Sequence, residues 1–157
     1  MKVLYWSSSA KSFHFCDTAK PEVATLLYNS FLFQLDDDVF IHVQNIYQIE
    51  AWNDEDLISG YVYEDVKPIR RAYLNVKDQS YKWICPRWMY PQDKFPNYAA
   101  GPAYIIPIKH VKCLYQMALK SDSKFYMEDI FVTGMLREKC NIELKLVLQM
   151  YKKDIYS

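Results

Sequence analysis

The stretch FLFQLDDD, residues 31–38, joins a short apolar run to three adjacent acidic side chains. A run this short, apolar and aromatic-rich predicts a buried β-strand over residues 31–35. Three neighbouring carboxylates repel one another, so their placement at a strand end is costly unless a cation lies there. Because alternate side chains of an extended segment point the same way, Asp36 and Asp38 are expected to face one site while Asp37 faces away.

The acidic triplet has two interpretations. Carboxylate oxygens are hard ligands that suit Mn²⁺ or Mg²⁺, and such an ion in turn suits a diphosphate. A solvated acidic turn that opens a helix explains the same residues, because carboxylates are stabilised near a helix N-terminus. A short amphipathic helix is expected soon after the triplet, from the spacing of Val43, Ile46, Tyr47 and Glu50.

The composition is that of one globular domain. The chain has 157 residues, of which 51% are hydrophobic and 24% are charged, and this length can bury a sizeable core. Lys plus Arg and Asp plus Glu are equal at 19 each, so no nucleic-acid partner is expected. The four cysteines form no CxxC pair, which argues against a zinc site and leaves three disulfide pairings open in an oxidising compartment.

Strand and helix patterns alternate along the chain, which predicts an α/β fold. Strands are expected over residues 57–63 and 98–106, the second broken by Gly101 and Pro102. Residues 64–97 hold four prolines and are expected to form irregular loops with short strands.

Two helices and a closing element are expected in the C-terminal part. Pro107 suits the first position of a helix whose apolar stripe comprises Ile108, Val111, Tyr115 and Ala118. A second helix is expected to begin at Glu128 and Asp129. Its buried side should carry the i,i+4 pairs Phe131/Met135 and Val132/Leu136. Residues 142–148 fit a strand or a helix equally well.

Glu128 and Asp129 form a second acidic group, which simple capping of a helix N-terminus also explains. Ligands of open α/β sheets bind beyond the carboxyl ends of the strands, where the first acidic group falls. Between the two groups lie aromatic and proline-rich segments and the turn residue Gly101. An acidic metal site, a glycine turn, an aromatic platform and a separate carboxylate are the parts needed to move a sugar from a nucleotide diphosphate.

Five segments in order carry a resemblance to a known family. They are LDDDVF (35–40), SGYVYEDVKPIRR (59–71), YKW (81–83), YPQDKFPNYAAGPAYII (90–106) and MEDIFVTGML (127–136). Their content and order resemble the β-1,3-galactosyltransferase and N-acetylglucosaminyltransferase family, from about Phe31 to Asn141. One such motif carries little weight, whereas five in order form a specific pattern.

The resemblance implies a GT-A nucleotide-sugar fold with a mixed central sheet flanked by helices. Residues 1–157 are expected to be a single partial glycosyltransferase domain that lacks the family's N-terminal part. The implied function is an inverting, metal-dependent hexosyltransferase. It would move galactose or an N-acetylhexosamine from a UDP-sugar to a glycan, glycoprotein or glycolipid acceptor in β-1,3 linkage. The implied location is the lumenal side of the Golgi membrane, and a homodimer is compatible with the family.

The resemblance also implies roles for the donor-side residues. Asp38 is expected to ligate Mn²⁺, and Asp36 to face the ribose or a metal-bound water. Asp37 is expected to be held by backbone N–H groups. Gly101 is expected where the backbone passes close to the donor sugar. The ion would act as a Lewis acid on the departing UDP.

The acceptor side needs a base and a surface for a sugar. Inversion requires the acceptor hydroxyl to lose a proton as it attacks, and Asp129 is the candidate base with Glu128 as the alternative. Trp83 is expected to stack on a sugar ring, with Lys82 and Tyr104 as further acceptor contacts. A core tryptophan and a solvated lysine explain Trp83 and Lys82 equally well.

Two departures from the family pattern support an alternative function. The chain resembles only the tail of the family's N-terminal third, and no histidine follows His110, where the family pattern has a metal-binding one. A catalytically inactive, truncated relative would act as a carbohydrate-binding or partner-interaction module. A metal-dependent phosphohydrolase is a third alternative, disfavoured because the aromatic, proline-rich middle lacks obvious phosphate-holding residues.

Overall fold

The computed structural model describes residues 3–7, 12–16, 30–36, 56–71, 82–121 and 125–147. The strands in these ranges are β1 (Val3–Ser7), β2 (Ser12–Cys16), β3 (Ser30–Leu35), β4 (Ile58–Tyr63), β5 (Tyr98–Pro107) and β6 (Leu144–Leu146). The helices there are α2 (Ile108–Leu119), the π-helix η4 (Ile130–Leu136) and α3 (Arg137–Lys139). The helix expected near residues 43–50, and Asp37 and Asp38, lie outside the described residues.

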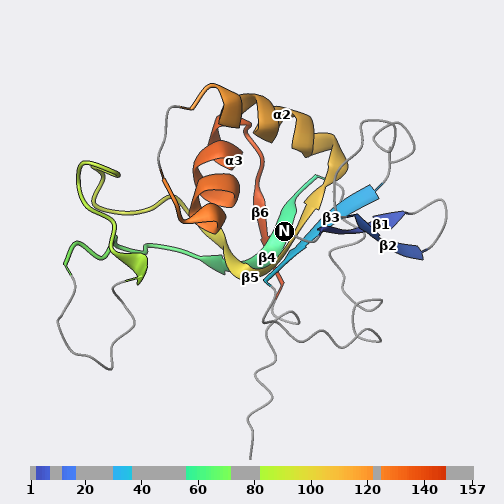
Figure 1. The fold of residues 1–157 in the computed structure, drawn as a ribbon, viewed down its shortest axis with the longest axis horizontal. Coiled ribbons are helices and arrows are strands. Elements are labelled where there is room, and N and C mark those ends of the chain that lie inside the picture. Colours follow the sequence, from blue (N-terminus) through green and yellow to red (C-terminus); the bar gives the residue numbers. More distant parts are fainter. Residues whose placement is uncertain are drawn as a thin grey trace, which may run out of the picture.

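The strands of the described ranges form one mixed sheet of six, in the order β2-β1-β3-β5-β4-β6. Neighbouring strands run antiparallel except β4 and β6, which are parallel. Helices α2 and α3 lie together over the sheet (Figure 1). This arrangement agrees with the α/β class expected from the sequence. The strand expected over 57–63 is confirmed as β4, and the ambiguous closing element is the strand β6.

The strand expected over residues 31–35 is confirmed as β3. Phe31 and Phe33 are buried in it, as an apolar run bounded by charge predicts. One further backbone hydrogen bond follows the strand, in which the Asp36 N–H donates to the Pro102 carbonyl at 3.2 Å. The backbone of the first residue of the acidic triplet is therefore attached directly to the middle of β5.

Strand β5 continues through Gly101 and Pro102, so the expected break was wrong. The irregularity is instead a shift in register against β4, between Gly60 and Val62. Proline is tolerated at such a bulge because it has no N–H to donate to the ladder. The ladder between β3 and β5 meanwhile remains regular over Phe31–Leu35.

Helix α2 is confirmed, but two details of the prediction were wrong. Pro107 keeps an extended backbone (φ −59°, ψ 132°) and ends β5, because it still pairs with Phe31 across the sheet. Leu114 is the buried residue of the helix, whereas Tyr115 is 63% exposed. Val111 and Ala118 of the expected stripe do pack against the core, so the stripe passes through Leu114 in place of Tyr115.

The second expected helix begins at Glu128 but is a π-helix through most of its length. In a π-helix the hydrogen bonds run from i to i+5, so residues four apart no longer share one face. Its fully buried residues are Ile130, Thr133, Gly134 and Leu136. Of the expected pairs Phe131/Met135 and Val132/Leu136, only Leu136 is buried, and the other three side chains are partly buried. All four predicted residues thus contact the core, but the prediction missed the buried residues Ile130, Thr133 and Gly134.

The main core lies between the sheet and the helices. Tyr104 and Ile106 of β5 pack there with Leu114 of α2 and Leu136 of η4. A disulfide joins Cys113 of α2 to Cys140 at the end of α3, while Cys85 is a free, buried cysteine. None of the helices in the described ranges is long and apolar enough to span a bilayer.

Candidate active site

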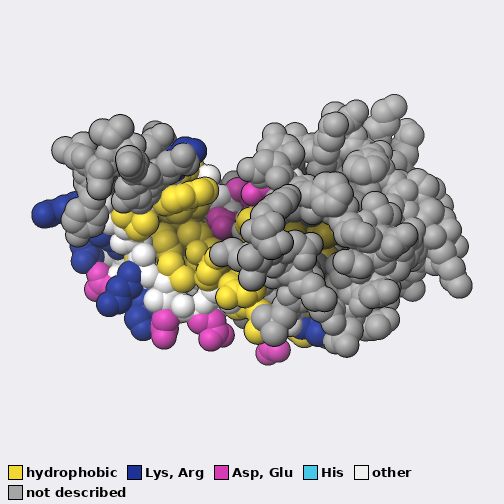
Figure 2. Space-filling view, turned by 90° about the horizontal axis from the view of Figure 1, so that it is seen from below, with side chains coloured by type: hydrophobic (Ala, Val, Ile, Leu, Met, Phe, Trp, Pro, Cys, Tyr) yellow, Lys and Arg dark blue, Asp and Glu magenta, His cyan; other side chains and the backbone are white. Residues whose placement is uncertain are grey.

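A cleft of about 560 Å³ lies at the end of β3, beside the bulge of β5 and the start of η4. Four residues singled out from the sequence line it together: Asp36, Gly101, Glu128 and Asp129. Trp83 lines the same cleft. Figure 2 shows acidic side chains in a hollow beside a hydrophobic surface. A second cavity, of about 650 Å³, contains none of the predicted site residues.

The Asp129 carboxylate is held by two backbone amides. The Gly101 N–H donates to Oδ2 at 3.2 Å, and the Ile130 N–H donates to Oδ1 at 2.8 Å. A Cβ at residue 101 would lie 3.3 Å from Oδ2, a tight contact that glycine avoids. Burial raises the pKa of Asp129, the backbone donors oppose the rise, and the Asp36 carboxylate adds to it.

The Glu128 carboxylate is held from the core side by a tyrosine. The Tyr104 hydroxyl donates to Oε1 of Glu128, while the Tyr104 side chain is only 2% exposed. Burial around the Glu128 carboxyl raises its pKa, and the neighbouring carboxylates of Asp129 and Asp36 raise it further. Tyr104 does not line the cleft. Tyr104 thus lies behind Glu128, on its core side. An acceptor in the cleft would not reach it, so the expected acceptor contact was wrong.

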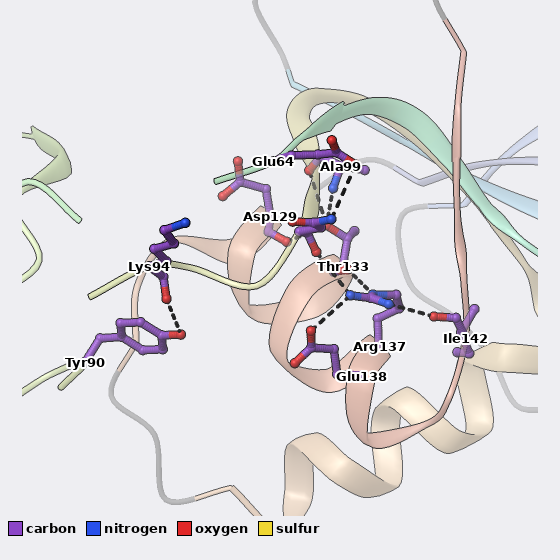
Figure 3. Close-up of polar contacts among 10 residues, drawn as sticks. Glu64, Tyr90, Lys94, Ala99, Asp129, Thr133, Arg137, Glu138 and Ile142 are labelled. Carbon is purple, nitrogen blue, oxygen red and sulfur yellow. Dashed lines mark hydrogen bonds and ion pairs between the residues drawn. The ribbon is translucent and has the colours of Figure 1, made fainter. Parts of the chain in front are cut away.

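Thr133 and Arg137 attach the π-helix to the sheet (Figure 3). The Ala99 N–H of β5 donates to the Thr133 hydroxyl at 2.8 Å. The Thr133 hydroxyl in turn donates to the Asp129 carbonyl oxygen at 2.7 Å. The Arg137 guanidinium donates to the carbonyl oxygens of Thr133 and Asn97, at 3.0 and 3.2 Å. The backbone that carries Asp129 is therefore anchored to the strand that also presents Gly101.

Aromatic side chains surround the carboxylates, and most of them were missed from the sequence. Tyr63, Tyr98 and Tyr126 line the cleft, as do the missed residues Ile69 and Lys67. Tyr63 and Lys67 belong to the quoted segment SGYVYEDVKPIRR, and Tyr126 lies two residues before Glu128. Their positions in or beside these motifs could have identified them as site residues from the sequence.

Two further residues lie away from the cleft lining: Lys82, expected at the acceptor, and Arg70 of the segment SGYVYEDVKPIRR. Lys82 is exposed and does not line the cleft. The Arg70 guanidinium donates to the carbonyl oxygens of Cys85 and Tyr90, at 2.8 and 2.7 Å, and so braces the loop that follows Trp83. This is a structural role, as an arginine in a loop often has.

The chemistry of the cleft suits a divalent cation, although the ligand set is not complete in the described residues. Asp36, Glu128 and Asp129 offer hard oxygens. Asp36 raises the pKa of both Glu128 and Asp129, and Asp129 raises that of Glu128, a repulsion that a cation would relieve. No group of three or more His, Cys, Asp or Glu within the described ranges is close enough to hold a metal ion. Asp38, the expected ligand, lies outside those ranges, so the Mn²⁺ site stays a prediction.

Glu128→Gln is expected to change the pH dependence of stability. Because the folded-state pKa of Glu128 is raised, its contribution is full below the unfolded pKa and is lost as pH rises through the folded value. Glutamine keeps an acceptor for Tyr104 but carries no charge. The melting temperature of the variant relative to the wild type should therefore increase from pH 4 to pH 7. Glu64→Gln, at an exposed position outside the cleft, is the control and should show no such trend.

Fold and cleft together define an α/β protein whose acidic, aromatic-lined cleft lies beside the middle strands of a mixed sheet. A family model described as galactosyltransferase matches residues 20–147. The chain therefore belongs to the galactosyltransferase family, which confirms the resemblance seen in its motifs.

Relatives in this family are named glycosyltransferases. The chain is 31% identical over 116 residues to the human lactosylceramide 1,3-N-acetyl-β-D-glucosaminyltransferase and 30% identical over 116 residues to the mouse protein of that name. It is 33% identical over 110 residues to the mouse N-acetyllactosaminide β-1,3-N-acetylglucosaminyltransferase 4. These alignments cover 69–71% of this chain and 29% of each relative. The chain thus matches a family of hexosyltransferases over less than a third of their length.

Proposed function

We propose that this chain is an inverting, metal-dependent hexosyltransferase with a GT-A fold. It would transfer galactose or an N-acetylhexosamine from a UDP-sugar to a glycan or glycolipid acceptor in β-1,3 linkage. The observation that carries the proposal is the convergence of Asp36, Gly101 and Asp129 on one cleft. The relatives' names, which include lactosylceramide and N-acetyllactosaminide, support an acceptor of this kind.

Asp129 is the proposed base. Two backbone N–H groups fix the orientation of its carboxylate, and each oxygen keeps a lone pair for an acceptor hydroxyl. Burial raises its pKa, which brings the carboxylate closer to the basicity that proton abstraction needs near neutral pH. Glu128, braced by Tyr104, lies beside it and would orient the acceptor through a hydrogen bond.

Asp36 and Asp38 would hold Mn²⁺ on the donor side. When bound, the ion supplies Lewis-acid stabilisation of the negative charge on the leaving diphosphate. The backbone of Asp36 is held by the Pro102 carbonyl, and Asp36 lines the same cleft as Gly101. Lys67 also lines the cleft and would add a positive charge for the phosphates.

Asp38→Asn is expected to weaken Mn²⁺-dependent UDP binding by at least about tenfold, since even outer-shell partners of a metal affect its affinity by about 10–100-fold. Isothermal titration calorimetry with UDP, with and without Mn²⁺, measures this. Asp93→Asn is the control because Asp93 is exposed, pairs with Arg87 and does not line the cleft. Equal binding by wild type and Asp38→Asn would contradict the metal assignment.

A carbohydrate-binding module without turnover is the second candidate. The exposed rings of Trp83 and Tyr126 at the cleft favour it, since aromatic faces bind sugars with no need for a base. Sugar transfer or UDP-sugar hydrolysis by the 157-residue chain would exclude it. Glycan binding that is lost in Trp83→Ala, with no turnover of any UDP-sugar, would support it.

A lumenal location, at the Golgi membrane, is part of the proposal. The Cys113–Cys140 disulfide supports it, because such bonds persist in oxidising compartments. Microscopy of the tagged protein beside a Golgi marker tests this location, and a cytosolic signal would contradict it.

A further inference from the structure

The hydroxyl of Tyr126 connects the carboxylate-bearing segment to the loop that carries Trp83. It donates to the Lys82 carbonyl oxygen at 2.9 Å and to the Ile84 carbonyl oxygen at 2.7 Å. These are the two carbonyl groups that flank Trp83 in the chain. A single hydroxyl proton shared between them restrains the backbone of Trp83 on both sides.

The backbone of Tyr126 is held in a fixed position near both Glu128 and Trp83. Its neighbours Phe125 and Met127 are buried in the core cluster that contains Cys85, so its backbone is anchored on both sides. It precedes Glu128 by two residues and lines the cleft with Trp83. The position of Trp83 relative to the carboxylates is therefore set within one short segment of chain.

The rest of the Trp83 loop has its own anchors. Ile69 and Ile84 form a parallel bridge, and the Cys85 N–H donates to the Ile69 carbonyl at 2.7 Å. Arg70 holds the Cys85 and Tyr90 carbonyls. Removal of the Tyr126 hydroxyl should consequently leave the loop folded and release only its Trp83 end.

We propose that Tyr126 is a positioning residue for acceptor recognition, acting through Trp83. The inference rests on the proposed transferase function and deepens it. With 54% of its surface exposed at the cleft, the Trp83 indole offers a face to the apolar side of a pyranose ring. An indole fixed by Tyr126 binds the acceptor at full strength, whereas a mobile indole binds it only in the fraction of molecules that holds the right orientation.

Tyr126→Phe is the test, with Tyr115→Phe on the exposed surface of α2 as the matched control. The acceptor KM should rise about 2- to 10-fold, which corresponds to the loss of one net hydrogen bond. The donor KM, and kcat at saturating acceptor, should stay unchanged. In a Trp83→Ala background the same substitution should have no further effect, because the two residues act as one unit. An equal rise in acceptor KM in both backgrounds would overturn the proposal.

A spectroscopic measurement separates this proposal from the transferase function. The chain has four tryptophans, so 5-fluorotryptophan labelling yields few ¹⁹F signals, and Trp83→Phe assigns that of Trp83. This signal should shift or broaden in Tyr126→Phe without any substrate, and stay unchanged in Tyr115→Phe. If the wild type transfers no sugar, the transferase proposal fails, and the substrate-free spectrum then decides the positioning of Trp83. An unchanged Trp83 signal in Tyr126→Phe would overturn it.

Discussion

Asp129→Asn is expected to lower the rate of sugar transfer by about 10²–10⁴-fold, the usual contribution of a positioned general base. Asparagine keeps the shape of the side chain but cannot take a proton from the acceptor hydroxyl. Its carbonyl oxygen can replace only one of the carboxylate oxygens that accept from Gly101 and Ile130. The contacts of Thr133 with the Asp129 carbonyl and Ala99 remain, so the variant should fold. Initial rates at saturating donor and acceptor measure the loss, and circular dichroism checks the fold.

Glu128→Gln provides the comparison for this rate measurement. It keeps the contact with Tyr104 and should reduce transfer much less than Asp129→Asn does. A larger loss in Glu128→Gln would assign the base to Glu128 instead. The pH profile gives a second criterion. Because the pKa of Asp129 is raised, kcat/KM should fall on the acid side at a pH above the ordinary range of an aspartate.

Cys113→Ser is expected to lower the free energy of unfolding by about 3.5 kcal/mol, from the loop-closure entropy of the cross-link. The disulfide closes a loop with a sequence separation of 27 and joins α2 to the end of α3. The single variant Cys140→Ser and the double variant should lose the same amount, because each removes the same bond. Urea unfolding followed by circular dichroism measures the difference.

Reduction supplies the control for the disulfide. Dithiothreitol should lower the stability of the wild type to that of the double variant and leave the double variant unchanged. Cys85 is a free and buried cysteine, and its thiol is the same in the wild type and in the variants. A wild type whose stability does not respond to dithiothreitol would contradict the pairing of Cys113 with Cys140.

The sequence by itself determined the elements whose signals are local. The apolar run of β3, the strand pattern of β4 and the proline before α2 predicted those elements, because side-chain periodicity and proline chemistry act within a few residues. The order of the motifs identified the family. It also selected Asp36, Gly101, Glu128 and Asp129, which line one cleft in the structure.

Only the tertiary structure decided the features that depend on distant contacts. The bulge at Gly101 exists because β5 pairs regularly with β3 while it shifts register against β4. The hydrogen bond from Gly101 to Asp129 spans 28 residues, and those from Tyr126 to the Trp83 loop span more than 40. The π-helical turns hold Thr133 against Ala99, a contact that no helical periodicity predicts. Side-chain patterns name the groups of a site, but pairing across the sheet determines which of them meet.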